Sequence, residues 1–122
     1  MDKRNFGKLG EQIAAEYIER YGFRILERNF RPGRLGEIDI IATENEYICF
    51  IEVKTRTSAS FGTPAEAVDY AKRKKIKSLA LIYLKSKNID NANIRFDIVE
   101  VTGKIEGSGF LPQNINIIRS AY

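Results

Sequence analysis

Side chains capable of phosphate chemistry interrupt two apolar stretches of the sequence. Asp39 lies within the stretch 36–42, and Glu52 and Lys54 lie at the end of the stretch 47–54. Carboxylate oxygens without histidine or thiolate partners favour Mg²⁺ or Mn²⁺ as their metal ion. Such an ion would polarise a phosphoryl oxygen and lower the pKa of a bound water, while the lysine ammonium would stabilise charge growing on the phosphate. The three residues together therefore predict metal-assisted hydrolysis of phosphodiester bonds.

The composition excludes most other catalytic chemistry. The chain has no histidine, which rules out Ser-His and Cys-His triads and histidine-ligated zinc. Any catalysis must therefore use carboxylates, lysine, tyrosine or a hard metal ion. A net charge of +4 and a pI near 9.2 are compatible with a polyanionic partner, although many proteins are mildly basic.

The length and composition indicate one globular domain over residues 1–122, because 43% of the residues are apolar and 30% are charged. The amino-terminal segment lacks the apolar core of a secretory signal, and the apolar runs are too short to span a membrane. Cys49 is the single cysteine, which excludes an internal disulfide and fits a reducing compartment. We expect a cytoplasmic protein without a membrane segment.

Hydrophobic periodicity predicts two helices and a mixed β-sheet. A first helix is predicted over 5–21 from apolar residues three and four apart, namely Phe6, Leu9, Ile13 and Tyr17, with Gly10 and Ala14 beside them. A second helical region is predicted from 65–70 onward, with an apolar stripe of Ile76, Leu79, Ala80 and Tyr83. Runs of β-branched and aromatic residues predict strands over 23–28, 37–43, 47–55, 94–101 and 115–118. The order of elements is typical of an α/β or α+β domain.

The position of one tight turn decides whether the acidic residues meet. We expect a two-residue turn at 44–45, which places Glu37 opposite Glu52 on the neighbouring strand. Asp39 and Glu52 then become diagonal neighbours, about 7–8 Å apart at the backbone, on the face that also carries Lys54. A three-residue turn would put Asp39 and Glu52 on opposite faces. Glu11 lies beside the apolar stripe of the first helix and reaches the same cluster if that helix packs on this face.

A purely structural interpretation competes with the catalytic one. An acid and a lysine two residues apart on a strand, such as Glu52 and Lys54, usually form a solvated face or a surface salt bridge. Asp39 within an apolar strand favours the functional interpretation, because two adjacent carboxylates repel each other unless a cation lies between them.

Basic residues on two sides of the acidic strands are candidates for phosphate contact. Lys72 and Arg73 belong to a basic cluster at 72–77, at the start of the second helical region, and a solvated surface is an equally open interpretation. Further candidates for nucleic-acid binding border the acidic strands, namely Arg31, Arg34 and Arg56. Contacts of this kind position a nucleic acid but do not specify its sequence.

Several of these segments together resemble the YraN family of uncharacterised proteins. The resemblance covers nearly the whole chain and rests on the segments 7–11, 29–31, 36–42, 50–56, 61–62, 66–68 and 95–99, with Ala14 and Ala15. That family is similar to the PD-(D/E)XK nucleases and, within them, to archaeal-type Holliday junction resolvases. The resemblance implies an α/β fold with a restriction-endonuclease-like core, in which a mixed β-sheet is flanked by α-helices.

The resemblance also implies roles for individual residues. Asp39 matches the motif aspartate, Glu52 and Lys54 match the E-x-K half, and Glu11 matches the helical glutamate. Asp39 and Glu52 would bind Mg²⁺ or Mn²⁺, with Glu37 supporting them. Ile38 stands where the superfamily motif has proline. The resolvase relatives imply DNA as the partner and a homodimer as the assembly.

Three functions are open at this point. The first is a metal-dependent endonuclease acting on DNA, including branched or damaged DNA. The second is a non-catalytic module with a nuclease-like fold that binds nucleic acid or a repair partner. The third is an unrelated basic protein that associates with RNA or ribosomes, which would explain the charge but not the acidic cluster.

Overall fold

The computed structural model describes residues 3–57 and 68–122, and the elements in these ranges follow the predicted order. They are α1 (Lys3–Arg20), β1 (Arg24–Phe30), β2 (Ile38–Glu44), β3 (Tyr47–Thr57), α2 (Tyr70–Ser86), β4 (Asn93–Glu106) and β5 (Gly109–Ile118). The last two strands extend well beyond the predicted ranges 94–101 and 115–118. They form a long antiparallel pair whose outer part is more exposed, so hydrophobic alternation marks only the inner part.

The strands form one five-stranded sheet in the order β1-β2-β3-β4-β5. All neighbours are antiparallel except β3 and β4, which are parallel, and α2 lies in the crossover between those two strands. A parallel pair requires such a long connection, whereas antiparallel neighbours can be joined by tight turns. The sheet is therefore mixed.

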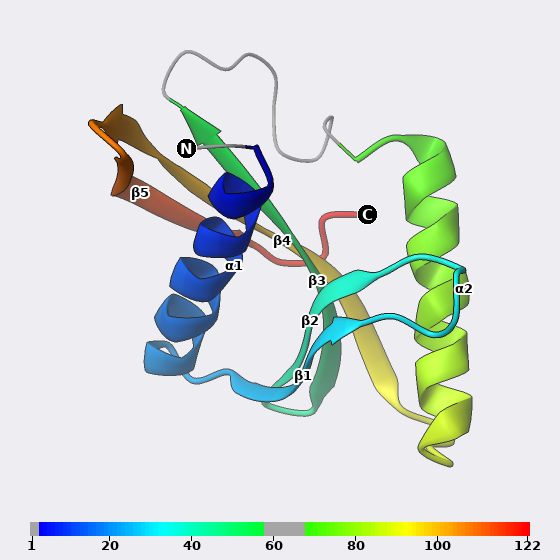
Figure 1. Cartoon of the computed structure of the whole chain (residues 1–122). Coiled ribbons are helices and arrows are strands. Elements are labelled where there is room, and N and C mark those ends of the chain that lie inside the picture. The colour runs from blue at the N-terminus through cyan, green and yellow to red at the C-terminus, as the bar shows by residue number, and fades with distance from the viewer. Residues whose placement is uncertain (1–2, 58–67) are drawn as a thin grey trace.

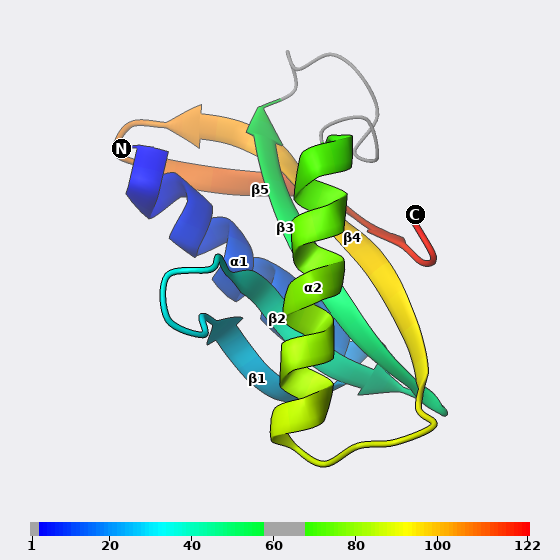
Figure 2. The same ribbon diagram turned by 90° about the vertical axis from the view of Figure 1, so that its right-hand side faces the viewer.

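The two helices cover opposite faces of this sheet (Figure 1). The view turned by 90° shows α2 in front of the strands and α1 behind them (Figure 2). Ala14, Ala15 and Ile18 of α1 pack with Ile40 and Ile51 in one core cluster. The α2 stripe predicted from the sequence, Ile76, Leu79, Ala80 and Tyr83, comprises the buried residues of that helix. The result is an α/β fold with the predicted restriction-endonuclease-like core.

The buried face of α1 differs from the predicted stripe by about one position. Its fully buried positions include Gly10, Ala14 and Ile18, whereas Ile13 and Tyr17 are only partly buried. Small residues in the centre allow the helix to approach the sheet closely, and larger side chains pack around them. The apolar periodicity indicated a helix correctly but not the centre of its contact face.

The start of α2 also differs from the prediction. Residues 65–67 lie outside the described residues, and Val68 and Asp69 precede the helix, which begins at Tyr70. The Asp69 side chain accepts a hydrogen bond of 2.9 Å from the backbone N–H of Lys72. A short carboxylate at this position satisfies an N–H group that has no partner within the helix, so Asp69 is the N-cap.

The predicted turn between β2 and β3 was wrong by one residue. Glu44 pairs with Tyr47, so the turn consists of Asn45 and Glu46, and Asn45 adopts a φ of 53°. Asparagine tolerates this left-handed conformation better than most residues, which favours it inside the turn. The register therefore differs from the expected one by two residues. Such an even shift keeps the paired side chains on their predicted faces, with Ile40 and Ile51 on one and Ile41 and Phe50 on the other.

Neither helix in the ranges 3–57 and 68–122 has the combination of length and apolar character that a membrane span requires.

Candidate active site

The corrected register places Asp39 and Glu52 side by side. Ile40 pairs with Ile51, so Asp39 and Glu52 are the next residues on their respective strands, rather than the diagonal neighbours expected from the sequence. Glu37 precedes β2 and does not pair with Glu52, which corrects the expected Glu37–Glu52 pair. The shift therefore brings the two motif carboxylates closer together than predicted.

A close contact between α1 and β3 places Glu11 at the same end of the sheet. Gly10 faces Thr55 so closely that a methyl group at position 10 would overlap the threonine side chain. The next residue, Glu11, therefore lies above the start of β2. Helix α1 packs on the opposite face of the sheet, against Ile40 and Ile51, whereas Glu52 contacts Lys72 of α2. The expected packing of α1 on the Glu52 face was therefore wrong, and Glu11 meets Asp39 at the end of the sheet instead.

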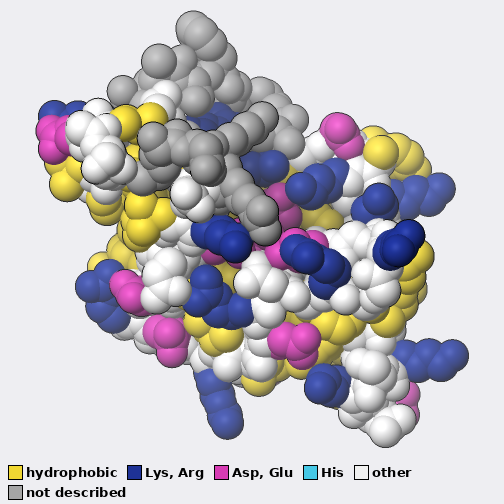
Figure 3. All heavy atoms as spheres, viewed as in Figure 1, with side chains coloured by type: hydrophobic (Ala, Val, Ile, Leu, Met, Phe, Trp, Pro, Cys, Tyr) yellow, Lys and Arg dark blue, Asp and Glu magenta, His cyan; other side chains and the backbone are white. Residues whose placement is uncertain are grey.

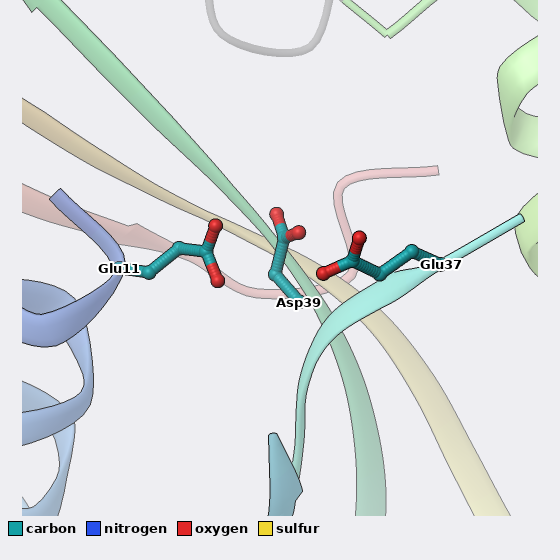
Figure 4. Close-up of side chains that lie close together, drawn as sticks. All are labelled: Glu11, Glu37 and Asp39. Atoms are coloured by element: carbon teal, nitrogen blue, oxygen red, sulfur yellow. The ribbon is translucent and has the colours of Figure 1, made fainter. Parts of the chain in front are cut away.

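Three carboxyl groups converge here from three different segments. Figure 4 shows the side chains of Glu11 from α1, Asp39 from β2 and Glu37 from the loop before β2, turned toward one another. One oxygen from each of the three lies within 4.8 Å of the others. Glu52 does not belong to this group, although its charge acts on Asp39. Glu11 and Glu37, which the sequence predicted beside the Asp39–Glu52 pair, thus form a close carboxylate cluster with Asp39.

Asn29 connects two members of this cluster. Its side-chain amide nitrogen donates hydrogen bonds of 2.6 Å to Glu11 and 2.7 Å to Glu37. Arg31 donates a hydrogen bond of 2.6 Å to the other oxygen of Glu37. Sequence reasoning missed Asn29 as a site residue, because an asparagine at the end of a strand predicts only a turn or a loop. Asn29 lies within β1, yet its φ of 54° is a left-handed value that is typical of turns.

Asp39 is the most perturbed acid of the cluster. Its carboxylate accepts a hydrogen bond of 2.8 Å from the backbone N–H of Val53, which ties the start of β2 to β3. Burial and, after it, the nearby charge of Glu52 raise the pKa of Asp39 to about 8, although the Val53 hydrogen bond lowers it somewhat. Burial also raises the pKa of Glu11 above its usual range. Asp39 and Glu11 therefore lie where burial disfavours their charged forms.

Two lysines in the described part of the chain pair with Glu52. It is buried, with only 5% of its side chain exposed, and its Oε1 lies 3.5 Å from Nζ of Lys54 and 2.8 Å from Nζ of Lys72. The Lys54 contact is the expected one within the E-x-K segment. The Lys72 contact was not anticipated, because the sequence does not reveal which strand faces the start of α2.

Basic side chains surround the acids on one face of the molecule (Figure 3). Arg34 is exposed on the loop between β1 and β2, and Arg31 is exposed while paired with Glu37. Arg56 is only 14% exposed and lies 3.3 Å from Glu100 on β4. Arg73 donates a hydrogen bond of 2.8 Å to the carbonyl of Val68, and its guanidinium lies 5.3 Å from the centre of the Tyr122 ring. Of the five basic candidates, Arg31 and Arg34 are thus the most accessible.

A cavity of about 440 Å³ opens beside the acids, toward α2. Its lining includes Glu37 and Asp39 on one side and Lys72 and Lys75 on the other. Hard carboxylate oxygens that approach one another this closely suit Mg²⁺ or Mn²⁺. The donor set therefore fits the ion that the sequence predicts.

Most of the chain matches a known protein family. The model of "Uncharacterised protein family UPF0102" matches residues 10–101. The chain belongs to the UPF0102 family. The match contains the acidic positions described above, from Glu11 to Glu52, together with Lys54. It agrees with the YraN resemblance drawn from the sequence, because UPF0102 and YraN denote the same family.

Individual UPF0102 proteins support this assignment over most of their length. A UPF0102 protein of Acetivibrio thermocellus is 44% identical over 121 residues, covering 99% of this chain and 93% of the relative. One from Caldicellulosiruptor saccharolyticus is 41% identical over 122 residues, covering all of both chains. One from Alkaliphilus oremlandii is 51% identical over 100 residues, covering 80% of this chain and 85% of the relative. The family name assigns no activity, so a function must be argued from the site.

Proposed function

We propose that this UPF0102 protein is a metal-dependent endonuclease that hydrolyses phosphodiester bonds in DNA. The observation that carries the proposal is the convergence of Asp39 with Glu11 and Glu37 beside a solvent-open cavity, with the Glu52–Lys54 pair on the neighbouring strand. The neighbouring carboxylates help to raise the pKa of Asp39 and of Glu11, and acids so placed are costly to keep together without a cation. Such a cost is expected of a metal site and not of a structural ion pair.

Each residue has a role in this proposal. A Mg²⁺ or Mn²⁺ ion held by Asp39 and Glu52, with Glu11 and Glu37 beside them, would supply a polarised phosphoryl oxygen and a bound water of lowered pKa. Lys54 keeps its ammonium next to Glu52, where it stabilises the negative charge that develops on the phosphate. Arg31 and Arg34 extend the positive surface along which a nucleic-acid backbone can lie.

The choice of DNA rests on the resemblance to Holliday junction resolvases. That resemblance favours branched DNA among the substrates, and the homodimer that it implies remains a prediction. A protein of this kind would contact phosphates through its basic side chains and select its substrate by shape.

The test is a cleavage assay with purified protein on single-stranded, duplex and four-way-junction DNA, with Mg²⁺, Mn²⁺ or EDTA. We expect metal-dependent cleavage that falls by about 100-fold or more in Asp39→Asn, Glu52→Gln and Lys54→Met, because each removes a group that interacts with the reacting phosphate or its metal ion. Glu46→Gln is the matched control, since Glu46 is exposed in the turn at the far end of the same two strands.

Two outcomes would contradict the proposal. Cleavage that persists in all three variants would come from another site or from a contaminant. Salt-sensitive binding of DNA without cleavage under any metal ion would instead identify a binding module with a nuclease-like fold.

A further inference from the structure

Lys72 occupies a helix position that does not favour a lysine. It lies in the first turn of α2, three residues after the N-cap Asp69, and this turn contains no acidic residue. The positive end of the helix dipole repels a cation there, and glutamate is the residue that usually completes a cap at this position. Interactions within the helix therefore do not favour a lysine at position 72.

The tertiary contact of Lys72 supplies the reason. Its Nζ lies 2.8 Å from Oε1 of Glu52, closer than the 3.5 Å between that oxygen and Nζ of Lys54. Glu52 is buried, whereas 45% of the Lys72 side chain is exposed. A buried carboxylate is costly without a positive partner, and Lys72 is the nearer of its two partners.

We propose that Lys72 is a resident cation of Glu52, that a divalent metal ion displaces it, and that the released ammonium then binds a phosphate group of the substrate. This inference rests on the proposed function, because the displacement requires metal binding at Glu52. It adds a phosphate-binding residue whose availability depends on the metal ion.

The two lysines of Glu52 differ in where they can go after displacement. Lys54 lies two residues from Glu52 on the same strand, so its ammonium stays close to the carboxylate. Lys72 reaches Glu52 from a different element, and it lines the cavity of about 440 Å³ beside Asp39. A metal ion that takes the Glu52 oxygen repels both ammonium groups, and only Lys72 has this cavity open to it. Glu37 and Asp39 line the same cavity, and once the metal ion holds these carboxylates an anionic phosphate in the cavity would supply the compensating charge for Lys72.

The first experiment measures binding of Mn²⁺ alone by isothermal titration calorimetry. We expect Lys72→Met to bind Mn²⁺ about 3- to 10-fold more tightly than the wild type, because the ion no longer competes with an ammonium for Glu52. Lys75→Met is the matched control, since Lys75 lines the same cavity from the next turn of α2 and carries the same charge. It should change the affinity less than about 2-fold through its longer-range charge.

Lys72→Arg completes this series, because it keeps a cation that can pair with Glu52 and should bind Mn²⁺ nearly as the wild type does. Equal effects of Lys72→Met and Lys75→Met would show that only net charge matters, and they would overturn the displacement. Weaker Mn²⁺ binding by Lys72→Met would overturn it as well.

The second experiment measures DNA affinity in EDTA and in Ca²⁺, an ion that also takes oxygen ligands. In EDTA, where Glu52 holds Lys72, the Lys72→Met change should alter DNA affinity less than about 2-fold; in Ca²⁺ it should weaken binding by about 5-fold or more. Equal weakening in both conditions would show that Lys72 is always available to phosphate and would overturn the inference. Tighter Mn²⁺ binding by Lys72→Met without any DNA binding would leave the displacement standing, and it would overturn the phosphate role together with the proposed function.

Discussion

At the scale of single residues, Asp39 combines a structural contact with an unfavourable charge. It accepts the hydrogen bond from Val53, which belongs to the strand pairing, and at the same time it lies beside Glu52 and Glu11. Its pKa of about 8 means that the metal-free folded protein holds a proton on Asp39 at neutral pH, whereas the unfolded chain does not. Functional sites commonly retain such conflicts, because a ligand relieves them.

The Asp39→Asn variant should therefore be more stable than the wild type when metal is absent. The folded-state pKa is raised from 3.8 to about 8, so the folded state binds more protons in this window and wild-type stability falls as pH rises through it. Asparagine keeps an oxygen for Val53 and carries no charge. We expect a gain of about 1–2 kcal/mol at pH 7, measured by urea unfolding in EDTA.

This gain should shrink as pH falls and become small below about pH 3, where Asp39 is largely protonated in both states because its unfolded-state pKa is 3.8. A gain that does not change with pH would arise from packing. A loss of stability at pH 7 would show that the ionised carboxylate is favourable in the folded protein.

At the scale of elements, the contact between α1 and β3 controls where Glu11 lies. Gly10 allows this contact, because Thr55 occupies the space that a side chain at position 10 would need. Thr55 is short and branched at its β-carbon, so it cannot rotate far out of the way. The position of the helical glutamate in the site thus depends on a residue without a side chain.

Gly10→Ala should destabilise the protein by about 1–3 kcal/mol, because the added methyl group overpacks the helix–sheet contact. It should also weaken Mn²⁺ binding, since Glu11 moves away from Asp39 and Glu37. Gly7→Ala is the control in the same helix, where nothing lies within 4 Å of the added methyl group. It should raise stability by up to about 1 kcal/mol, because alanine is the better helix former. Similar effects of the two changes on thermal unfolding would disprove the role assigned to Gly10.

At the scale of the whole molecule, a second charged network lies at the other end of β2. Glu44 receives hydrogen bonds from Arg119, at 2.6 and 2.7 Å, and from Arg95 on β4, at 2.7 Å. Arg95 also pairs with Asp97, which is completely buried and accepts the backbone N–H of Ser120. This network joins β2, β4 and the carboxy-terminal segment, so we assign it to stability and not to catalysis.

Glu44→Gln should cost stability in a way that depends on pH. The hydrogen bonds from Arg119, together with those from Arg95, lower the pKa of Glu44 from 4.5 to about 2. A lowered folded-state pKa means that this stabilisation is complete above about pH 4.5 and is lost as pH falls toward 2. We expect a loss of about 1–2 kcal/mol at pH 7, after allowing for solvent around Arg119, and a smaller loss at pH 3, measured by urea unfolding.

Glu106→Gln is the matched control, because Glu106 pairs with Lys104 at 3.0 Å and both side chains are more than half exposed. It should change stability by less than about 0.5 kcal/mol. A loss for Glu44→Gln as small as this, or one that is the same at pH 3 and pH 7, would contradict the assigned role of the network.

The basic surface as a whole predicts salt-dependent DNA binding. Affinity for duplex DNA falls as salt rises, and each phosphate contact makes the plot of log affinity against log salt steeper by about 0.9. Arg34→Ala should make this plot less steep by about 1, because Arg34 is exposed beside the site and its phosphate contact is lost. Arg56→Ala should leave the slope nearly unchanged and reduce stability instead, because Arg56 is largely buried and paired with Glu100. DNA affinity measured between about 50 and 200 mM salt checks both variants. A less steep salt dependence in Arg56→Ala but not in Arg34→Ala would show that Arg56, and not Arg34, contacts phosphate.

The sequence determined the elements and the face of the sheet on which the acids lie. Periods of 2 and 3.6 residues are local properties, so the strands that carry Asp39 and Glu52 and the buried stripe of α2 could be predicted from neighbouring residues alone. The family resemblance then connected Glu11 with the acids on the strands.

Only the tertiary structure decided which of these side chains touch. One asparagine turn set the register between β2 and β3, and the packing of α1 and α2 brought Asn29 and Lys72 to the carboxylates. Such contacts join residues up to about twenty positions apart in the chain, and their formation depends on how helices and strands pack. No local pattern encodes these distances, because the free energy that fixes them comes from the burial of both faces of the sheet at once.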